Sequence, residues 1–272
     1  MSNLAIRTIT GLTFALVMLG VVWAGKAFTF GLFFLAAMVG LYELFKLGGG
    51  EKHLSLYVLM GGGVVLSLLF FLFLYQWPAV SPYIFLLVPL LFLALAISTL
   101  QTHSRTPLIA LGHTVGGLFY VIVGFFLAGF VSFSWPGWEP LYLTGFLLIL
   151  WLNDSGAYIV GSLLGRTPLA PSLSPKKTWE GTSGGVLVAL LVGLLLAEFS
   201  GVGGYFFWMG GAALIAIAGV LGDLFQSALK RNAGVKDSGN VLPGHGGVLD
   251  RYDAMLFAGP VFAIWVILVE II

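Results

Sequence analysis

The sequence predicts an all-α protein that crosses a membrane about nine times. Apolar residues make up 59% of the 272 residues and charged residues only 8%, whereas a soluble domain carries about 25% charged residues. The apolar residues gather in segments of roughly 20 residues, the length that crosses the hydrocarbon core as a helix. The cations fall almost entirely in alternate connections between these segments, as is typical of polytopic membrane proteins.

The apolar segments follow one another along the whole chain. They occupy about residues 9–25, 28–47, 54–75, 82–100, 108–133, 141–164, 183–200, 203–229 and 254–272. The closely spaced first two could instead form a re-entrant pair. Each is expected to be helical, because backbone groups that face lipid must form their hydrogen bonds within the segment. No soluble domain or repeat interrupts them, so the prediction is a single helical bundle.

The distribution of lysine and arginine predicts the orientation of the bundle. With nine spans, eleven cations fall on the side of the N-terminus, and only Lys26 falls on the other side. The eleven are Arg7, Lys46, Lys52, Arg105, Arg166, Lys176, Lys177, Lys230, Arg231, Lys236 and Arg251. Since basic connections stay in the cytoplasm, we expect a cytoplasmic N-terminus and a C-terminus on the opposite side.

The polar residues divide the chain into two parts. Residues 1–140 carry few charges and are expected to form scaffold, lipid-facing or dimer-forming helices. Residues 141–272 contain the two long connections, 165–182 and 230–253, both on the predicted cytoplasmic side. Any polar substrate is therefore expected to react in the second part. Cysteine is absent, which excludes thiolate chemistry and cysteine-based metal sites.

A first polar group lies inside the span at 141–164, in the stretch Asn153-Asp154-Ser155-Gly156-Ala157-Tyr158. An ionised carboxylate in the membrane centre costs about 2.5–3.5 kcal/mol, so Asp154 needs a cation, a metal ion or a water-filled cavity. Its polar neighbours favour the wall of a cavity. A structural hydrogen bond to another helix is the alternative.

A second group is the run Ser174-Pro175-Lys176-Lys177-Thr178-Trp179-Glu180-Gly181. We expect a turn that presents the ammonium groups of Lys176 and Lys177, with the hydroxyl of Thr178 beside them. Lysine supplies point charges for phosphate. The same lysines could instead serve only as a topology signal next to a membrane helix.

The third and richest group runs from Asp223 to Asp253. Asp223, Ser227 and Lys230 share one face of a helix, since they are spaced at i, i+4 and i+7, and Asp250 and Asp253 share a face at i, i+3. A pairing of Asp223 with Asp250 across adjacent helices would suit Mg²⁺, which is commonly held by one or two carboxylates and substrate phosphates. Alternatively, these acids pair only with the basic side chains around them.

Side chains suited to anions lie in the same stretch. Arg and Lys form charge-assisted hydrogen bonds with phosphate. The four cations here are Lys230, Arg231, Lys236 and Arg251. His245 stands among glycines, and Gly246 and Gly247 would let backbone N–H groups approach an anion closely. On its own, His245 would more simply form a loop hydrogen bond.

Together these stretches resemble the signature of the phosphatidate cytidylyltransferases, also called CDP-diacylglycerol synthases. The resemblance rests on Ser227-Ala-Leu-Lys230-Arg231, four residues, Lys236-Asp237-Ser-Gly, and Leu242-Pro-Gly-His245-Gly-Gly-Val-Leu-Asp250-Arg251-Tyr-Asp253. The first and second polar groups resemble the family's other polar segments in the same order. The detailed agreement covers about 151–253 and more than a dozen positions, with Tyr252 a small departure.

The resemblance implies a reaction and its site. CTP and phosphatidic acid would give CDP-diacylglycerol and pyrophosphate with Mg²⁺, a second cation being left open. The expected metal ligands are Asp223 and Asp250, with Asp253 and Asp154 as further candidates. The charged residues expected to act in catalysis are Asp223, Lys230, Arg231, Asp250 and Arg251. The residues expected to bind substrate are Lys176, Lys177, Thr178, Ser227, Lys236, His245, Gly246 and Gly247.

The same family suggests a homodimer, and the chain suits a bacterial inner membrane with the site facing the cytoplasm and no nucleic-acid partner. Three other classes of protein are alternatives. A purely structural membrane scaffold would have no need of so dense a polar connection. A transporter would need polar residues along several spans and access from both sides, whereas the polar residues here gather at one side. A lipid or polyprenol kinase that uses CTP, which the chain resembles more distantly, would release CDP in place of pyrophosphate.

Overall fold

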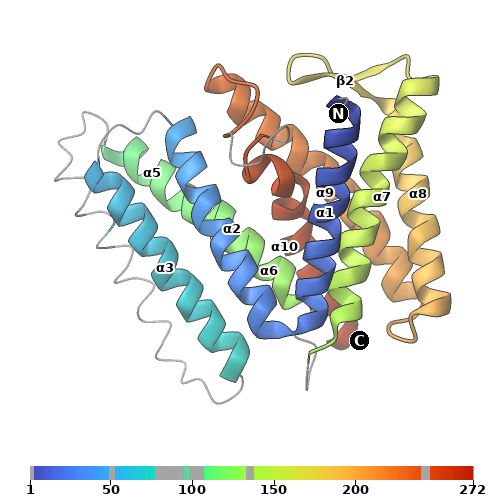
Figure 1. Ribbon diagram of the computed structural model, residues 1–272, viewed down its shortest axis with the longest axis horizontal. Coiled ribbons are helices and arrows are strands. Elements are labelled where there is room, and N and C mark those ends of the chain that lie inside the picture. The colour runs from blue at the N-terminus through green and yellow to red at the C-terminus, as the bar shows by residue number, and fades with distance from the viewer. Residues whose placement is uncertain are drawn as a thin grey trace.

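The protein is a bundle of α-helices with a short β-hairpin, seen here in a computed structural model (Figure 1). The structure describes residues 3–48, 53–76, 93, 95, 97, 107–132, 138–239 and 246–271. The first half contains α1 (Asn3–Ala24), α2 (Lys26–Leu47), α3 (His53–Gln76), α5 (Pro107–Leu118), the π-helical turn η2 (Phe119–Val123) and α6 (Gly124–Phe130). The second half contains α7 (Pro140–Leu164), β1 (Pro168–Ala170), β2 (Ser174–Thr178), α8 (Trp179–Phe199), α9 (Tyr205–Asn232) and α10 (Leu249–Ile271).

The helices have the length and composition of membrane spans, which supports the predicted all-α membrane class. Within the described residues, six are long and apolar enough to cross a membrane: Lys26–Leu47, Leu111–Phe130, Pro140–Leu164, Trp179–Phe199, Tyr205–Asn232 and Leu249–Val269. Shorter apolar helical stretches occupy Thr10–Ala24 and Leu59–Phe70. The span predicted at 82–100 lies outside the described residues except for Leu93, Leu95 and Ile97. The total of nine spans stays a prediction.

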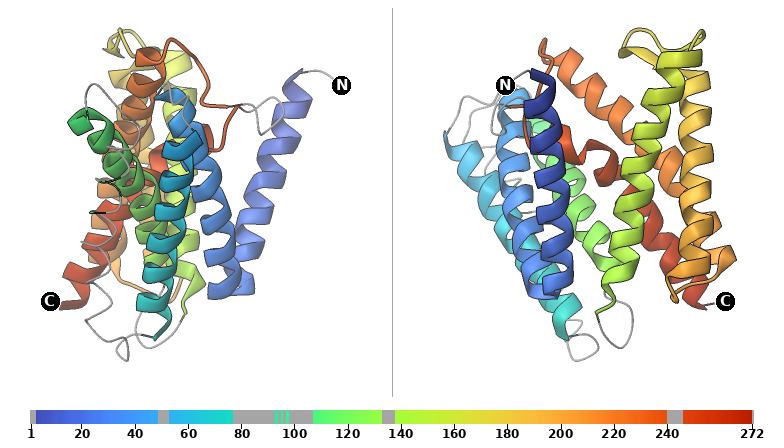
Figure 2. Two further views of the ribbon diagram at one scale, coloured as in Figure 1. Left: turned by 90° about the vertical axis from the view of Figure 1, so that its left-hand side faces the viewer. Right: turned by 45° about the vertical axis from the view of Figure 1, so that its right-hand side comes forward.

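The second half forms a layer of neighbouring helices, in which α7 packs on α8, α8 on α9, and α9 on α10. Helix α10 also packs on α6, while α2 lies between α1, α3 and α6 (Figure 2). The start of α1, the β1–β2 hairpin and the last turn of α9 lie at one end of the bundle, and the C-terminus lies at the other (Figure 1). We call the end of the bundle that holds the β1–β2 hairpin the hairpin end, and define it by residues 164–178 and 230–232.

Glycines allow the helices of the second half to approach closely. A Cβ atom on Gly185 of α8 would lie 2.7 Å from the carbonyl oxygen of Asn153 on α7, and one on Gly181 would lie 2.8 Å from that of Ala157. On α9, a Cβ atom on Gly222 would lie 2.6 Å from the carbonyl oxygen of Asp253 on α10. Small residues at such crossings let backbones pack in van der Waals contact, and both crossings lie beside predicted site residues.

The connection 165–182 differs from the expected turn. It contains the antiparallel strands β1 and β2, paired with Pro168 opposite Thr178 and Ala170 opposite Ser174. The carboxylate of Glu180 accepts hydrogen bonds from the backbone N–H groups of Arg166 and Thr167, which fixes the start of the hairpin. The turn expected at Ser174–Thr178 is therefore wrong, because these residues form strand β2.

Two helices of the second half begin earlier than the apolar pattern predicts. Helix α8 begins at Trp179, where 183 was expected, because the Thr178 hydroxyl accepts the Gly181 N–H at 3.1 Å and caps the helix. Helix α10 begins at Leu249, where 254 was expected. A prediction based on the length of the apolar segments misses the polar first turns of these two helices.

Candidate active site

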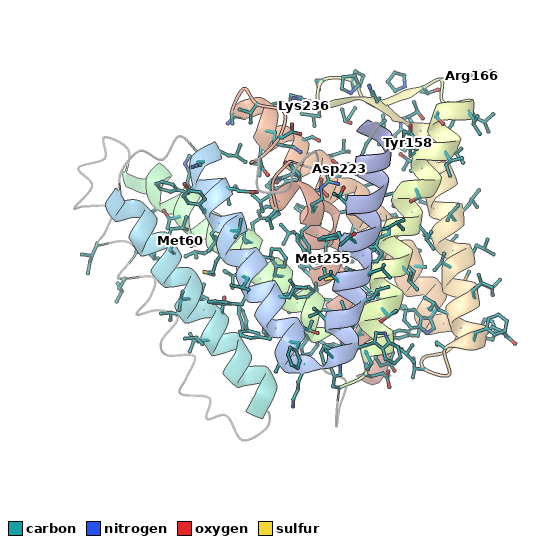
Figure 3. All side chains as sticks on the ribbon, in the orientation of Figure 1. Met60, Tyr158, Arg166, Asp223, Lys236 and Met255 are labelled. Carbon is teal, nitrogen blue, oxygen red and sulfur yellow. The ribbon has the colours of Figure 1, made fainter. Side chains whose placement is uncertain are left out.

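Three helices bring three of the predicted acids together at the hairpin end. Asp154 lies on α7, Asp223 on α9 and Asp253 on α10, and each of the three interacts electrostatically with the other two. We call these three residues the acidic cluster. Asp223 and Asp253 are half-buried and Asp154 is exposed, so the cluster is open on one side. Figure 3 labels Asp223 in the upper part of the bundle, below the hairpin.

Two lysines provide positive charge at this cluster. Lys177 on β2 forms an ion pair with Asp223 and also interacts with Asp154. Lys230 in the last turns of α9 interacts with Asp253 and pairs with Asp250 at 2.7 Å. Because successive side chains of a strand point to opposite faces, Lys176 is directed away from Lys177 and is exposed. The structure therefore separates the two lysines that the sequence treats as a pair.

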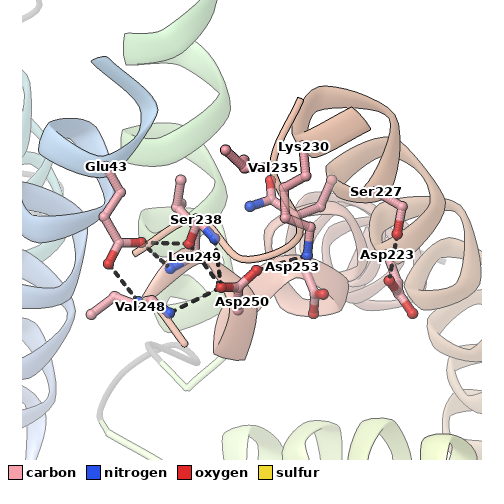
Figure 4. A network of polar contacts seen from close by, with 12 residues as sticks. Glu43, Asp223, Ser227, Lys230, Val235, Ser238, Val248, Leu249, Asp250 and Asp253 are labelled. Atoms are coloured by element: carbon pink, nitrogen blue, oxygen red, sulfur yellow. Dashed lines mark hydrogen bonds and ion pairs between the residues drawn. The ribbon is translucent and has the colours of Figure 1, made fainter. Parts of the chain in front are cut away.

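Asp250 has surroundings different from those of the acidic cluster (Figure 4). Its Oδ1 accepts a hydrogen bond from Lys230, and its Oδ2 accepts from the backbone N–H groups of Ser238 at 2.7 Å and Gly247 at 2.9 Å. The Ser238 hydroxyl lies 3.1 Å from the same Oδ2. The sequence predicted a pair of Asp223 with Asp250, but the acid that the described contacts place with Asp223 is Asp253.

The chain between α9 and α10 starts from a well-formed helix end. The Val235 N–H donates to the Lys230 carbonyl and the Gly234 N–H to the Arg231 carbonyl, which are the two bonds of a Schellman motif. Gly234 occupies the left-handed position with φ of 70°, where a side chain would be strained. The Arg231 guanidinium donates to the Val235 carbonyl at 3.2 Å. This turn directs residues 235–239 back toward α10.

The remaining predicted site residues fall into three groups. Ser227 donates to Asp223 at 3.4 Å, as the shared helix face predicts, and Thr178 acts as the cap of α8. The basic residues that are exposed around the site are Lys176, Arg231, Lys236 and Arg251. Gly246 and Gly247 lie next to Asp250, whereas His245 lies outside the described residues.

Two polar residues beside the acidic cluster were missed by the sequence analysis. The Tyr120 hydroxyl donates to Oε1 of Gln226 at 3.3 Å, and Tyr120 interacts electrostatically with Asp253 and Asp223. Gln226 is fully buried, and its Nε2 has no hydrogen-bond partner among the described residues. A buried donor without a partner costs about 1–3 kcal/mol, so this amide is an energetic cost beside the acidic cluster. The sequence signal that could have identified Gln226 was its position as a polar residue within the apolar segment 203–229.

Glu43 is a further polar residue that the sequence analysis missed. It lies on α2, in the first half of the chain, and is only 2% exposed. Its carboxylate contacts Ser238 and the start of α10 (Figure 4). The sequence signal that could have identified Glu43 was its position as an acid inside the predicted span 28–47. Asp154 was identified by the same kind of signal.

The donor atoms at the acidic cluster fit a hard divalent cation. The described residues contain no group of three metal-ligating side chains close enough to form a complete cage. Mg²⁺ does not need one, because it is usually held by one or two carboxylates together with substrate phosphates and water. The acidic cluster and Asp250 supply four carboxylates, whereas Lys177 and Lys230 supply two ammonium groups. The carboxylates of the acidic cluster are therefore chemically suited to an additional cation.

Comparison with known proteins shows the family of the chain. The profile of the cytidylyltransferase family matches residues 5–269, nearly the whole chain. The chain belongs to the cytidylyltransferase family. The family assignment made from the three polar stretches is therefore confirmed.

Individual relatives within this family match shorter segments. A protein of Staphylococcus aureus strain COL, named phosphatidate cytidylyltransferase, is 42% identical over 141 residues, which cover 51% of this chain and 54% of the relative. A protein of the same name from Bacillus subtilis strain 168 is 46% identical over 114 residues, which cover 42% of each chain. The matched segment thus spans about half the length of these relatives.

Proposed function

We propose that this protein transfers the cytidylyl group of CTP to phosphatidic acid, with Mg²⁺, and releases pyrophosphate. The observation that carries the proposal is the match of the cytidylyltransferase profile across residues 5–269, which include all three polar stretches. The relatives that are 42% and 46% identical in part of their length are named for this reaction. The lipid product would be CDP-diacylglycerol.

The residues of the site suit a reaction between two phosphate groups. In the proposed reaction, an oxygen of phosphatidate forms a bond to the α-phosphorus of CTP. The bond from that phosphorus to the oxygen that bridges to the β-phosphorus breaks, and pyrophosphate leaves with the electron pair. The phosphatidate oxygen is already ionised near neutral pH, so the step needs no strong general base. Catalysis then depends on positioning and on neutralisation of charge.

The cations of the site are assigned according to where they lie. Lys177 and Lys230, at the acidic cluster, are proposed to contact the reacting phosphates. The exposed Arg231, Lys236 and Arg251 are proposed to hold the nucleotide phosphates as CTP arrives from water. Mg²⁺ would be held by Asp223 and Asp253, with Asp154 nearby, and would supply Lewis-acid polarisation of the phosphoryl oxygens. Asp250 is proposed to act through Lys230, which it holds by an ion pair.

The placement of the protein in the membrane is part of the proposal. Phosphatidate has its acyl chains in the bilayer and its head group at the surface, and CTP is dissolved in the cytosol. A site at the hairpin end serves both if that end faces the cytoplasm, as the distribution of cations predicts. We propose a bacterial inner membrane, because the relatives described above are bacterial. A homodimer is proposed on the family resemblance alone.

Product analysis tests the proposed function. Purified protein in lipid–detergent micelles is given phosphatidate, CTP and Mg²⁺, and lipid product and pyrophosphate are followed together. Equal amounts of a CMP-bearing lipid and pyrophosphate are expected. Formation of CDP and a newly phosphorylated lipid would identify a kinase, and no turnover with any lipid acceptor would remove the support for an enzyme.

A further inference from the structure

A carboxylate from the first half of the chain is built into the start of α10. Oε1 of Glu43 accepts the Val248 N–H at 2.8 Å, and Oε2 accepts the Leu249 N–H at 2.9 Å and the Ser238 hydroxyl at 2.8 Å. Glu43 is separated from these partners by about 200 residues of sequence, and all three bonds are buried. Figure 4 shows the side chain reaching from the α2 ribbon to the start of α10.

These bonds give Glu43 the role of a helix cap supplied by another helix. The first N–H groups of a helix lack partners within it, and the helix dipole places partial positive charge there. Within the described residues Glu43 takes part in no ion pair, since the pairs found there are Lys177–Asp223 and Lys230–Asp250. The start of α10 and the Ser238 hydroxyl are thus the groups that compensate the buried carboxylate. If Glu43 were replaced by Gln, the amide NH₂ group would face a backbone N–H group, so that two donors would meet and one hydrogen bond would be lost.

The connection before α10 is shaped to let Glu43 approach. A Cβ atom on Gly239 would lie 2.6 Å from Oε1 of Glu43, and one on Gly247 would lie 2.6 Å from its Cδ. Both positions therefore require glycine for this contact. The Ser238 hydroxyl lies within hydrogen-bond distance of both Glu43 and Asp250. Since a hydroxyl has one proton to donate, it links the two carboxylates through a single shared donor.

We propose that Glu43 is a positioning residue for the active site, acting through the first turn of α10. By holding Val248, Leu249 and Ser238, it sets the register of α10, from whose first two turns Asp250 and Asp253 project. The inference rests on the proposed function, because it concerns the site at which CTP and Mg²⁺ would bind. It also gives α2 an indirect part in the chemistry, beyond the role of a scaffold.

The test compares Glu43→Gln with a matched control, Glu139→Gln. Glu139 also caps a helix, since its Oε1 accepts the Leu141 N–H at 3.1 Å, but it lies at the start of α7, away from the hairpin end. In Glu43→Gln we expect the half-saturating concentrations of Mg²⁺ and CTP to rise by about tenfold, the effect of disturbing one charged hydrogen bond. In the control both should stay within about twofold of the wild type.

This readout separates positioning from folding. A purely structural role would lower the fraction of active protein and leave the half-saturating concentrations unchanged, and that result would overturn the proposal. If Glu43→Gln does not fold, Ser238→Ala takes its place, because it removes the shared hydroxyl alone. The expected change has the same direction, and unchanged half-saturating concentrations in a folded Ser238→Ala protein would count against the proposal.

Amide hydrogen exchange provides a test that does not depend on the reaction. In Glu43→Gln, the amides of Val248 and Leu249 are expected to exchange about tenfold faster than in the wild type. The amides at the start of α7 should be unaffected. If the wild type lacks transferase activity but this exchange effect is found, the proposed function fails while the contact by Glu43 stands. Unchanged exchange at both amides would refute the positioning role itself.

Discussion

The crossing of α9 and α10 at Gly222 leads to the most specific prediction. A Cβ atom at this position would lie 2.6 Å from the carbonyl oxygen of Asp253, 2.9 Å from Cβ of Phe257 and 3.2 Å from Cα of Ala254. Non-bonded heavy atoms prefer about 3.5–4.0 Å, so Gly222→Ala must separate the two backbones by about 1 Å. Overpacking of this kind costs about 1–3 kcal/mol of stability. Because Asp223 is the next residue, the same shift moves it relative to Asp253.

A shift of about 1 Å between catalytic groups can lower turnover by roughly a hundredfold. We therefore expect Gly222→Ala to remain folded and to lose about that much kcat, measured as pyrophosphate release in lipid–detergent micelles. Gly219→Ala is the matched control on the same face of α9. There the added methyl would lie 2.9 Å from the end of the Leu150 side chain, which can rotate away. Equal turnover in the two variants would refute the account of how the crossing aligns the acids.

Three further predictions concern individual charges. Asp223→Asn and Asp253→Asn should each abolish turnover while the thermal midpoint stays within a few degrees, and substantial activity in either variant would exclude that residue from the metal site. Lys177→Gln should reduce kcat/KM for CTP by at least about tenfold, whereas Lys176→Gln, at an exposed position, should reduce it by less. A larger loss in Lys176→Gln would contradict the assignment of Lys177 to the face of β2 that meets the acidic cluster. EDTA should stop the reaction and added Mg²⁺ should restore it, whereas full turnover in EDTA would show that the acidic cluster acts without a divalent cation.

The helical class could be predicted from local sequence, whereas the roles assigned to the site residues stay predictions. Apolar segments of membrane length indicate helices with little ambiguity, and acids within or beside them are conspicuous because burial is costly for them. The same pattern misses polar first turns, which is why α8 and α10 begin earlier than expected. The β1–β2 hairpin was also missed, since its strands have only 3 and 5 residues, both strands contain proline, and β2 is polar.

The partner of each acid could not be predicted, because it depends on tertiary packing. Asp250 and Asp253 are three residues apart, and sequence spacing alone does not decide which of them meets Asp223. In the structure Gly222 packs against the Asp253 backbone, and Asp253 is the acid of α10 that interacts electrostatically with Asp223. The contact of Glu43 with the start of α10 joins residues about 200 positions apart, and no local pattern indicates such a contact.

The fate of labelled phosphorus tests the central claim most directly. CTP labelled at the α-phosphorus and CTP labelled at the γ-phosphorus are supplied in separate reactions with phosphatidate and Mg²⁺. Our account predicts that the α-label enters the lipid and the γ-label appears in pyrophosphate. Transfer of the γ-label to the lipid would contradict cytidylyl transfer and identify a CTP-dependent kinase.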